Sequence, residues 1–379
     1  MLLSAQVVLA IRVFSRMLRT ARGRRMPAAD PSEVIDGRVS VIVPVLNERD
    51  RLGPCLDGLT AQGPEVADIL VVDGGSTDHT PDLVQTYARR DPRVRLIDAL
   101  PVPTGWNGKT HGLQVGLNQA PTEIDWIVTI DADVRPAPGL VRALLAFARQ
   151  EDVLALSLAT LQDLSGPPEA ALHPALLTTL VYRFGIPGLA TNRVSAVQAN
   201  GQCLLLRRDV LAAAGGFASA RDSLCEDVTL ARTIAALGYC VGFYESEGLV
   251  WTAMYTGWRD AWRNWTRSLP LRDRYSGLAG WLGLVEVTLV QAIPLPLAIV
   301  LSRSRRQTLP IAVLAYLNLG LAIARLGVLV GTSRAYRSRP WSYWVSPVSD
   351  VPVAVGVWLS AVRRRHEWRG RPIIRGGPR

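Results

Sequence analysis

Residues 69–78 read ILVVDGGSTD, a run of apolar and β-branched residues that passes into a glycine turn and then into a helix start. Asp73 ends the apolar run, and the two glycines after it allow a sharp turn. Thr77 and Asp78 are residue types that often begin a helix. A strand, a tight turn and a helix in this order predict one unit of an α/β fold.

The same pattern recurs on both sides of this stretch, between residues 38 and 248. Further apolar runs of strand length are 39–46, 94–98, 126–131 and 153–158. Amphipathic stretches of helical length lie between them, at 78–88, 109–118 and 139–149. Strands that alternate with helices predict a mainly parallel sheet, and ligands of such sheets bind beyond the carboxyl ends of the strands.

Four clusters of polar residues fall at these strand ends or at helix starts. They are PVLNERDRL at 44–52, VVDGGSTDHT at 71–80, TIDAD at 129–133 and CEDVTLA at 225–231. Each cluster alone has an ordinary explanation, such as a turn, a helix N-cap or a solvated loop. Their order and placement along one chain are harder to explain in that way.

Together with GKTHGLQVGL at 108–117, these motifs resemble the family-2 glycosyltransferases, whose GT-A fold is a Rossmann-like α/β fold that binds nucleotide sugars. The resemblance covers roughly residues 38–275. The spacing of PTGWNGK, GQCLLLRRDVLAAAGGF and RDSLCEDVTLA is most similar to membrane-bound members that glycosylate carotenoids or hopanoid-type lipids. The resemblance implies an inverting hexosyltransferase that uses a nucleotide-diphosphate sugar.

The resemblance also implies roles for individual acidic residues. Asp227 matches the catalytic base, the carboxylate that takes a proton from the acceptor hydroxyl, and Glu226 is its orienting neighbour. Asp133 would contact a divalent cation, Mg²⁺ or Mn²⁺, because a hard cation stabilises the charge that develops on a leaving diphosphate. Lys109, the one lysine of the chain, should begin a helix that faces the nucleotide pocket.

The other donor-binding residues that the resemblance implies lie in the first three motifs. They are Pro44, Asn47 and Glu48 for the nucleotide pocket, Asp73 for the base or ribose, and Asp131 for the ribose or sugar.

Residues 262–270 read WRNWTRSLP, where processive polysaccharide synthases of the family carry Gln-x-x-Arg-Trp. The missing glutamine and the reversed Trp–Arg order indicate a single transfer. Trp258, Trp262 and Trp265 share one helical face, which either lines an acceptor site or anchors the protein at the bilayer interface. Arg267 would meet the donor diphosphate or a lipid phosphate.

The composition divides the chain into four segments. We expect an N-terminal amphipathic or membrane-anchoring helix in 1–26, a catalytic domain in 38–275, membrane-associated helices in 278–362 and a basic cytoplasmic tail in 363–379. The apolar runs 281–301, 309–330 and 341–362 each reach the roughly 20 residues that a membrane helix needs. They are interrupted by Glu286, Arg325, Asp350 and several prolines.

These runs predict a cell-membrane protein that is multi-pass, or partly re-entrant at Pro294 and Pro296, with its catalytic domain on the cytoplasmic side. The net charge of +10 favours anionic partners, but the arginines lie beside apolar segments, which indicates lipid rather than nucleic acid. We expect a lipid acceptor, first a carotenoid or other isoprenoid alcohol.

The alternatives are a glycerolipid or polyprenyl phosphate as acceptor, or a non-catalytic subunit that binds nucleotide sugars. Two other enzyme classes are not favoured, because this sequence lacks the glycine-rich loop that each requires. A sugar-1-phosphate nucleotidyltransferase would need such a loop after the first strand, where residues 45–50 read VLNERD, and a dinucleotide dehydrogenase would need GxGxxG after a strand.

Overall fold

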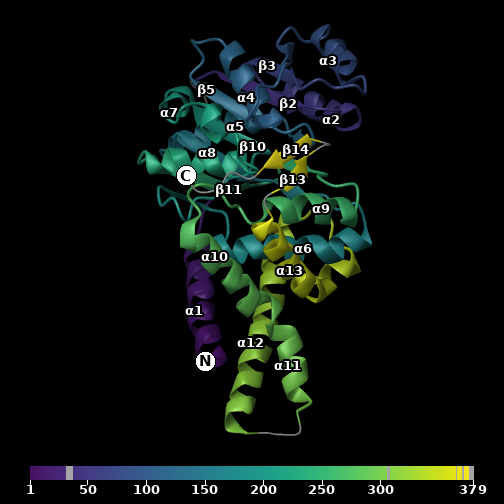
Figure 1. The fold of residues 1–379 in the computed structure, drawn as a ribbon. Helices are drawn as coiled ribbons and strands as arrows, with labels where there is room; N and C mark the ends of the chain where they lie inside the picture. Colours follow the sequence, from purple (N-terminus) through teal and green to yellow (C-terminus); the bar gives the residue numbers. More distant parts are fainter. Residues whose placement is uncertain (31–36, 305–307, 364, 369–370, 375–379) are drawn as a thin grey trace.

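The computed structural model describes residues 1–379 except 31–36, 305–307, 364, 369–370 and 375–379. An α/β unit forms one end of the molecule, and a layer of helices lies beneath it (Figure 1). Helices α1 (Leu2–Thr20), α11 (Pro294–Ser302) and α12 (Leu309–Thr332) project away from this layer.

A nine-stranded sheet forms the centre of the α/β unit. In sheet order its strands are β1 (Arg25–Met26), β11 (Val241–Ser246), β7 (Ala155–Ala159), β10 (Cys203–Arg207), β5 (Trp126–Ile130), β2 (Val39–Val45), β3 (Val66–Asp73) and β4 (Val94–Asp98), and β9 (Leu189–Thr191) pairs with β11. Strands β5, β2, β3 and β4 are parallel to one another, whereas β10 is antiparallel to both of its neighbours. The predicted mainly parallel sheet is therefore confirmed.

Alternate residues of each strand face opposite sides of the sheet, and helices cover both sides. Val41 and Val43 pack in the core with α2 (Arg49–Thr60) and α5 (Leu140–Gln150), whereas Ile42 packs in the core on the other side. Helices α4 (Gly108–Gln119), α7 (Arg208–Ala213) and α8 (Glu226–Ala236) cover that second side. Burial of each such aliphatic side chain contributes about 1.5–3 kcal/mol.

Helix α4 lies unusually close to the sheet because Gly116 faces the strands. A Cβ atom at this position would lie 2.5 Å from Cγ2 of Ile42 and 3.0 Å from Cγ2 of Val72. The absence of a side chain at Gly116 therefore lets the helix that begins at Lys109 pack tightly over β2 and β3.

Several elements were not among those that the sequence predicted. Helix α2 contains Pro54, and helix α6 (Pro167–Phe184) contains Pro174 and lies between the sheet and the lower helices (Figure 1). Helix α3 (Thr80–Ala88), by contrast, is one that the sequence predicted, directly after the DGGSTD turn. A second, small sheet consists of β6 (Val134–Pro136), β12 (Val250–Thr252) and β8 (Leu161–Gln162).

The layer of helices beneath the sheet packs around α6. Side chains of α6, α9 (Trp258–Ser268), α10 (Gly277–Glu286) and α13 (Asp350–Val362) form one apolar cluster, in which Leu176, Ala261, Leu284 and Val357 are fully buried or nearly so. Helix α6 therefore joins the α/β unit to the C-terminal helices.

Two helices of the described chain are long and apolar enough to cross a membrane, Leu309–Ala335 and Trp341–Val362. A third candidate is a pair of helices, Gly277–Ala292 and Pro294–Ser302, which meet at an angle of 42°. A π-helical turn, Val287–Ala292, precedes the bend, and Pro294 begins the second helix.

Each charged residue that interrupts an apolar run has a partner of opposite charge. The Glu286 carboxylate, 1% exposed, accepts hydrogen bonds from Arg12 and Arg16 of α1, at 3.0 Å for Arg16 Nη1. The Arg325 guanidinium lies 2.9 Å from the Asp350 carboxylate, and both side chains are buried. Such pairing reduces the cost of burying a charge.

The basic tail expected at 363–379 is described in part. Residues Arg365–Trp368 and Arg371–Ile374 form the two-stranded hairpin β13–β14, and residues 364, 369–370 and 375–379 lie outside the described residues.

Candidate active site

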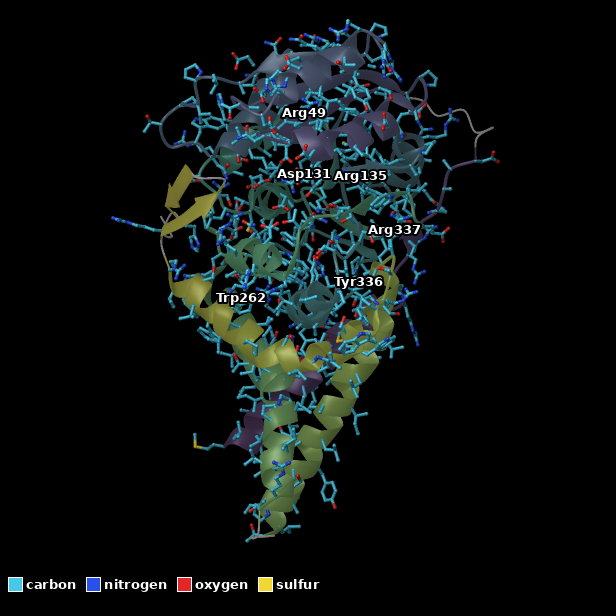
Figure 2. All side chains as sticks on the ribbon, turned by 90° about the vertical axis from the view of Figure 1, so that its right-hand side faces the viewer. Arg49, Asp131, Arg135, Trp262, Tyr336 and Arg337 are labelled. Carbon is cyan, nitrogen blue, oxygen red and sulfur yellow. The ribbon has the colours of Figure 1, made fainter. Side chains whose placement is uncertain are left out.

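A polar cleft of about 1360 Å³ opens at the carboxyl ends of the parallel strands. Helices α9 and α13 close its other side, and Figure 2 labels Asp131 and Trp262 on these two walls. The sequence-predicted residues that line it are Pro44, Glu48, Lys109, Asp131, Asp133, Asp227, Trp265 and Arg267. Segments more than two hundred residues apart in sequence therefore meet at one site.

The antiparallel strand β10 explains how these segments meet. Cys203, the first residue of β10, pairs with Ile130, the last residue of β5. The residues before β10, Asn200–Gln202, therefore lie beside the Asp131–Asp133 turn, and both segments line the cleft.

Lys109 lies at the centre of the charged residues. The Asn107 side chain caps α4 by accepting a hydrogen bond from the Lys109 backbone N–H at 3.0 Å, which sets the direction of the lysine. The Lys109 Nζ atom is 2.8 Å from Asp131 Oδ1 and 2.8 Å from Glu226 Oε1. Burial alone would lower the pKa of Lys109, but the carboxylates of Asp131 and Glu226 outweigh it and raise this pKa well above its usual value.

Asp227 follows Glu226 in the first turn of α8, and its carboxylate is held from two directions. The Gly201 backbone N–H donates to Asp227 Oδ2 at 2.7 Å, and the Val228 N–H donates to Oδ1 at 2.8 Å. Burial, and next the negative charge of Glu226, raise the pKa of Asp227 to about 7, against the opposing effect of Lys109. Asp227 is therefore a carboxylate with increased affinity for a proton.

Gly201 lies close to the side chains of Lys109 and Asp227. A Cβ atom here would lie 3.2 Å from Lys109 Nζ and 3.4 Å from Asp227 Oδ2. The missing side chain therefore lets the backbone N–H reach the carboxylate.

Asp133 has the chemistry of a cation ligand. Its Oδ1 atom is buried and has no hydrogen-bond partner among the described residues. Burial, and next the charge of Asp131, raise the pKa of Asp133 above its usual value, so an added cation here would stabilise the ionised form. Carboxylate oxygens are the ligands that Mg²⁺ and Mn²⁺ prefer.

Within the described residues, no group of three or more His, Cys, Asp and Glu side chains is arranged to hold a metal by itself. The donor set at Asp131 and Asp133 therefore fits a cation whose remaining ligands come from a substrate and water, the arrangement usual for Mg²⁺ with phosphates.

Two predicted residues, Asn47 and Asp73, are not among the described residues that line the cleft. Asn47 has a φ of 55°, and its side-chain oxygen accepts a hydrogen bond from the Thr77 N–H at 2.8 Å. The Asp73 carboxylate accepts from the Ser76 N–H at 3.0 Å. Both side chains hold the DGGSTD turn against the loop after β2, and their contact with a nucleotide stays a prediction.

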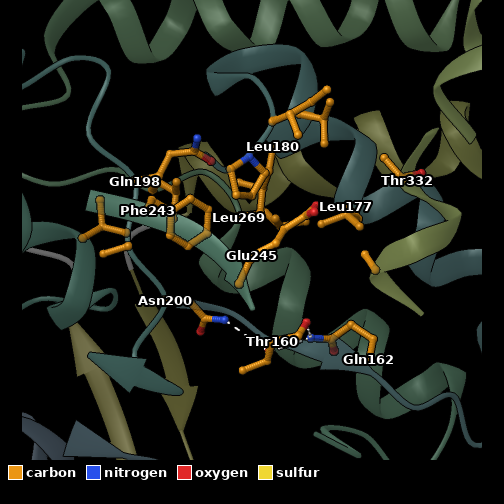
Figure 3. Close-up of a pocket in the computed structure, with 18 of the residues that line it drawn as sticks. Thr160, Gln162, Leu177, Leu180, Gln198, Asn200, Phe243, Glu245, Leu269 and Thr332 are labelled. Atoms are coloured by element: carbon orange, nitrogen blue, oxygen red, sulfur yellow. Dashed lines mark hydrogen bonds between the residues drawn. The ribbon is translucent and has the colours of Figure 1, made fainter. Parts of the chain in front are cut away.

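A second cavity, of about 600 Å³ and mostly apolar, adjoins the cleft. Figure 3 shows Leu177, Leu180 and Phe243 around it, with Thr160 and Gln162 hydrogen-bonded at its polar end. It extends from the cleft to α6, α12 and the end of α1. Lys109, Asn200, Asp227, Met254, Trp265, Arg267 and Ser268 line both spaces. Asp227 therefore lies where the polar cleft meets the apolar cavity.

Trp265 is held in position at this junction by His173 of α6. The two ring centroids are 4.2 Å apart, and His173 Nδ1 lies 3.0 Å from the Tyr336 hydroxyl. Burial lowers the pKa of His173 to about 3, so the imidazole is neutral under ordinary conditions. Nothing in the local sequence around His173 indicated this contact.

Sequence reasoning also missed Asn200, Gly201 and Gln202 as cleft residues. The available signal was NGQ directly before an apolar strand, but it points to the site only once β10 is known to run antiparallel to β5.

Replacement of Lys109 by methionine should destabilise the protein, because three neighbouring carboxylates lose their cation. We expect a loss of about 3 kcal/mol at pH 7.5, the lower end of the range for buried ion pairs that lose one partner, because the Lys109 side chain is 19% exposed. The pKa of Asp227 is already raised to about 7 against the opposing effect of Lys109, so without Lys109 it should rise further, and the loss should shrink as the pH falls and Asp227 becomes protonated.

Thermal unfolding of the full chain in detergent between pH 5 and 8 would measure this effect. The matched control is Arg207→Met, which removes the exposed pair with Asp209 and should cost no more than about 0.5 kcal/mol. Equal, pH-independent effects in both variants would contradict the prediction.

Residues 40–212 match the family model described as "Glycosyl transferase family 2". A relative from Yersinia pestis, an undecaprenyl-phosphate 4-deoxy-4-formamido-L-arabinose transferase, is 31% identical over 33% of this chain and 38% of its own length. An N-acetylglucosaminyl-diphospho-decaprenol L-rhamnosyltransferase from Mycobacterium tuberculosis is 26% identical over 71% of this chain and 97% of its own length.

The uncharacterized glycosyltransferase YibD from Escherichia coli is 25% identical over 31% of this chain and 32% of its own length. The chain thus spans about a third of the length of the E. coli and Y. pestis relatives. Among solved structures, the mannosyltransferase PcManGT from Pyrobaculum calidifontis, in complex with GDP-Man and Mn²⁺, has a TM-score of 0.50 at 20% identity and covers 96% of this chain and 99% of that one.

The structural likeness confirms the predicted GT-A fold. Residues 40–212, a little under half of the chain, are similar to the family-2 glycosyl transferases.

Proposed function

We propose that this protein is a membrane-bound inverting glycosyltransferase that moves a single sugar from a nucleotide-diphosphate sugar to the hydroxyl group of a lipid. The observation that carries the proposal is the position of Asp227, which lines both the polar cleft and the apolar cavity. A base at this junction can contact a polar donor and an apolar acceptor at once.

On the donor side, Asp131, Asp133 and Lys109 would surround the diphosphate. Asp133 would hold Mg²⁺ or Mn²⁺, which neutralises the charge on the departing diphosphate, and Asp131 would contact the ribose or the sugar. Lys109 holds Asp131 in place at 2.8 Å and adds a positive charge in the same region. Pro44 and Glu48 would line the nucleotide pocket, and Asn47 and Asp73 would shape it through the turn that they hold.

On the acceptor side, Asp227 would act as the general base. The acceptor oxygen forms the new bond to the anomeric carbon, its proton passes to the Asp227 carboxylate, and the bond from the anomeric carbon to the diphosphate oxygen breaks. The Gly201 N–H fixes Oδ2 of the base, and burial, followed by the charge of Glu226, raises its pKa. Trp265 and Arg267 would border the acceptor where the two spaces meet.

The apolar cavity favours a lipid acceptor. It is lined by side chains of α6 and α12, and α12 is one of the helices apolar enough to cross a membrane. Its polar end offers the neutral side chains of Thr160, Gln162 and Asn200, which suit an alcohol. We propose a carotenoid or other isoprenoid alcohol, reached from the cytoplasmic side of the membrane; the names of the Y. pestis and M. tuberculosis relatives support a lipid-linked acceptor in general.

The transfer reaction can be tested in membranes that contain the full chain. They would be incubated with UDP-, GDP- and dTDP-sugars, and the extracted lipids analysed by mass spectrometry. Asp227→Asn should reduce transfer at least about 100-fold, the smaller end of what a general base contributes. The matched control is Asp222→Asn, an exposed residue of the loop before α8, which should retain activity.

A new lipid glycoside in the wild type and in Asp222→Asn, but not in Asp227→Asn, is the expected result. Full activity in Asp227→Asn would remove the assigned base, and a product that is a glycosyl phosphate would replace the alcohol by a polyprenyl phosphate.

The pH dependence of transfer should report the proton affinity of Asp227. Because its pKa is raised to about 7 and only the ionised form can accept a proton, activity should rise with pH through this region. Glu226→Gln removes a like charge and frees Lys109 to act on Asp227, so the midpoint of the rise should move to lower pH. Glu226→Asp keeps the charge and should keep the midpoint; an unmoved midpoint in Glu226→Gln would contradict this account.

Metal removal should stop transfer. Excess EDTA should abolish activity, and added Mn²⁺ or Mg²⁺ should restore it. Asp133→Asn should need at least about tenfold more metal for half-maximal activity, because loss of a direct ligand costs no less than loss of an outer-shell partner. Undiminished turnover in excess EDTA would exclude this role of Asp133.

A further inference from the structure

A third cavity, of about 410 Å³, lies where α1 and α10 meet the α/β unit. Figure 1 shows both helices directly below the sheet. Of the described residues that line this cavity, six are arginines and one, Glu286, is acidic. The arginines are Arg12, Arg16, Arg19, Arg183, Arg193 and Arg232. They come from α1, α6, α8 and the loop after β9, so the tertiary structure gathers them.

The carboxylates near this cavity do not balance the arginines. Glu286 already pairs with two of them, Arg12 and Arg16. Asp273 pairs with Arg232 at 2.9 Å. Six guanidinium groups therefore face two carboxylates, which leaves a local excess of positive charge.

Two of the arginines are buried, and of these only Arg232 has a described carboxylate partner, Asp273. Arg183 is 7% exposed and donates to backbone carbonyl groups, at 3.0 Å for Thr179 and 3.4 Å for Pro270; no described carboxylate forms an ion pair with it. Arg232 is 4% exposed, and its Nε atom is buried without a hydrogen-bond partner among the described residues. Burial, and next the charge of Arg232, lower the pKa of Arg183 to about 9.

Small residues of the neighbouring helix also line the cavity. They are Ala279, Gly280 and Gly283 of α10, and a Cβ atom on Gly283 would lie 2.9 Å from Cδ of Arg183, so the arginine stem packs directly against this helix. Thr20, Tyr275 and Ser276 also line the cavity, although their hydroxyl groups donate to other protein groups. Guanidinium groups are suited to bind phosphate oxygens.

We propose that this cavity binds a phosphate anion, supplied by the headgroup of an anionic phospholipid or by free phosphate in solution. The site is separate from the donor cleft, since it shares none of the acidic residues of that cleft. It lies beside helices that carry the apolar surface, where lipid phosphates are available and attract arginines. A bound phosphate would offset the excess positive charge of the arginines that line the cavity and hold α1 and α10 against the α/β unit.

The experiment measures thermal unfolding of the full chain in an uncharged detergent at constant ionic strength. Three additives are compared: short-chain phosphatidylglycerol, short-chain phosphatidylcholine and inorganic phosphate. A ligand that binds the folded state raises the unfolding temperature with its concentration. Stabilisation by phosphatidylglycerol alone identifies a lipid headgroup site, and stabilisation by inorganic phosphate as well identifies a site open to free anions.

The double variant Arg19→Gln/Arg193→Gln tests the location. Both residues are exposed, so the variant should fold, and the additive should bind about tenfold more weakly. The matched control, Arg89→Gln/Arg90→Gln, removes two exposed arginines after α3 at the far end of the molecule and should bind as the wild type does (Figure 1).

Two results would overturn the proposal. One is that neither phosphatidylglycerol nor phosphate stabilises the wild type more than phosphatidylcholine does. The other is that both double variants respond like the wild type, which would place any bound phosphate elsewhere, for example in the donor cleft. Neither result depends on sugar transfer, so the proposed function would stand or fall separately.

Discussion

The candidate active site depends on one ammonium group, that of Lys109, which lies between the carboxylates of Asp131 and Glu226. Asp131 follows a central strand and Glu226 begins a helix almost a hundred residues later, so the lysine joins two separate parts of the chain. Without a cation between them, these acids and Asp227 would repel one another in a partly buried cleft. The Lys109 ammonium reduces this repulsion. Asp227, whose pKa is raised, can therefore lie close to the residues proposed to bind a diphosphate.

A similar rule governs the helices beneath the α/β unit. Glu286, Arg325 and Asp350 interrupt apolar runs, and each is paired: Glu286 with arginines of α1, and Arg325 with Asp350. Because ion pairs replace the lost hydration, these segments keep an apolar outer surface while their charges stay inside. The pairing of Glu286 also fixes α1 against α10, although the two are far apart in sequence.

The two spaces that meet at Asp227 have opposite polarity. Carboxylates, a lysine and backbone amides surround the cleft, whereas leucines of α6 and small residues of α12 surround the apolar cavity. This separation suits a reaction between a water-soluble, charged donor and an acceptor that stays in the bilayer. Trp265 and Arg267 belong to both walls, and His173 holds Trp265 from beneath. The border of the proposed acceptor site therefore depends on α6. No sequence motif indicated this helix, and its contribution follows from the way it packs.

The sequence alone determined the parallel strands, the helices after them and the acids at their ends, because periodicity and turn residues act over short distances. The rule that ligands bind at the carboxyl ends of strands predicted that Asp73, Asp131 and Asp133 lie together, and the family resemblance added Asp227; Asp131, Asp133 and Asp227 line one cleft, whereas Asp73 is not among its lining residues. The antiparallel pairing of β10, the contact of Gly201 with the base, and the arginines gathered around the third cavity were decided by the tertiary structure. Each needs the relative position of segments distant in the chain, and local sequence carries no information about that position.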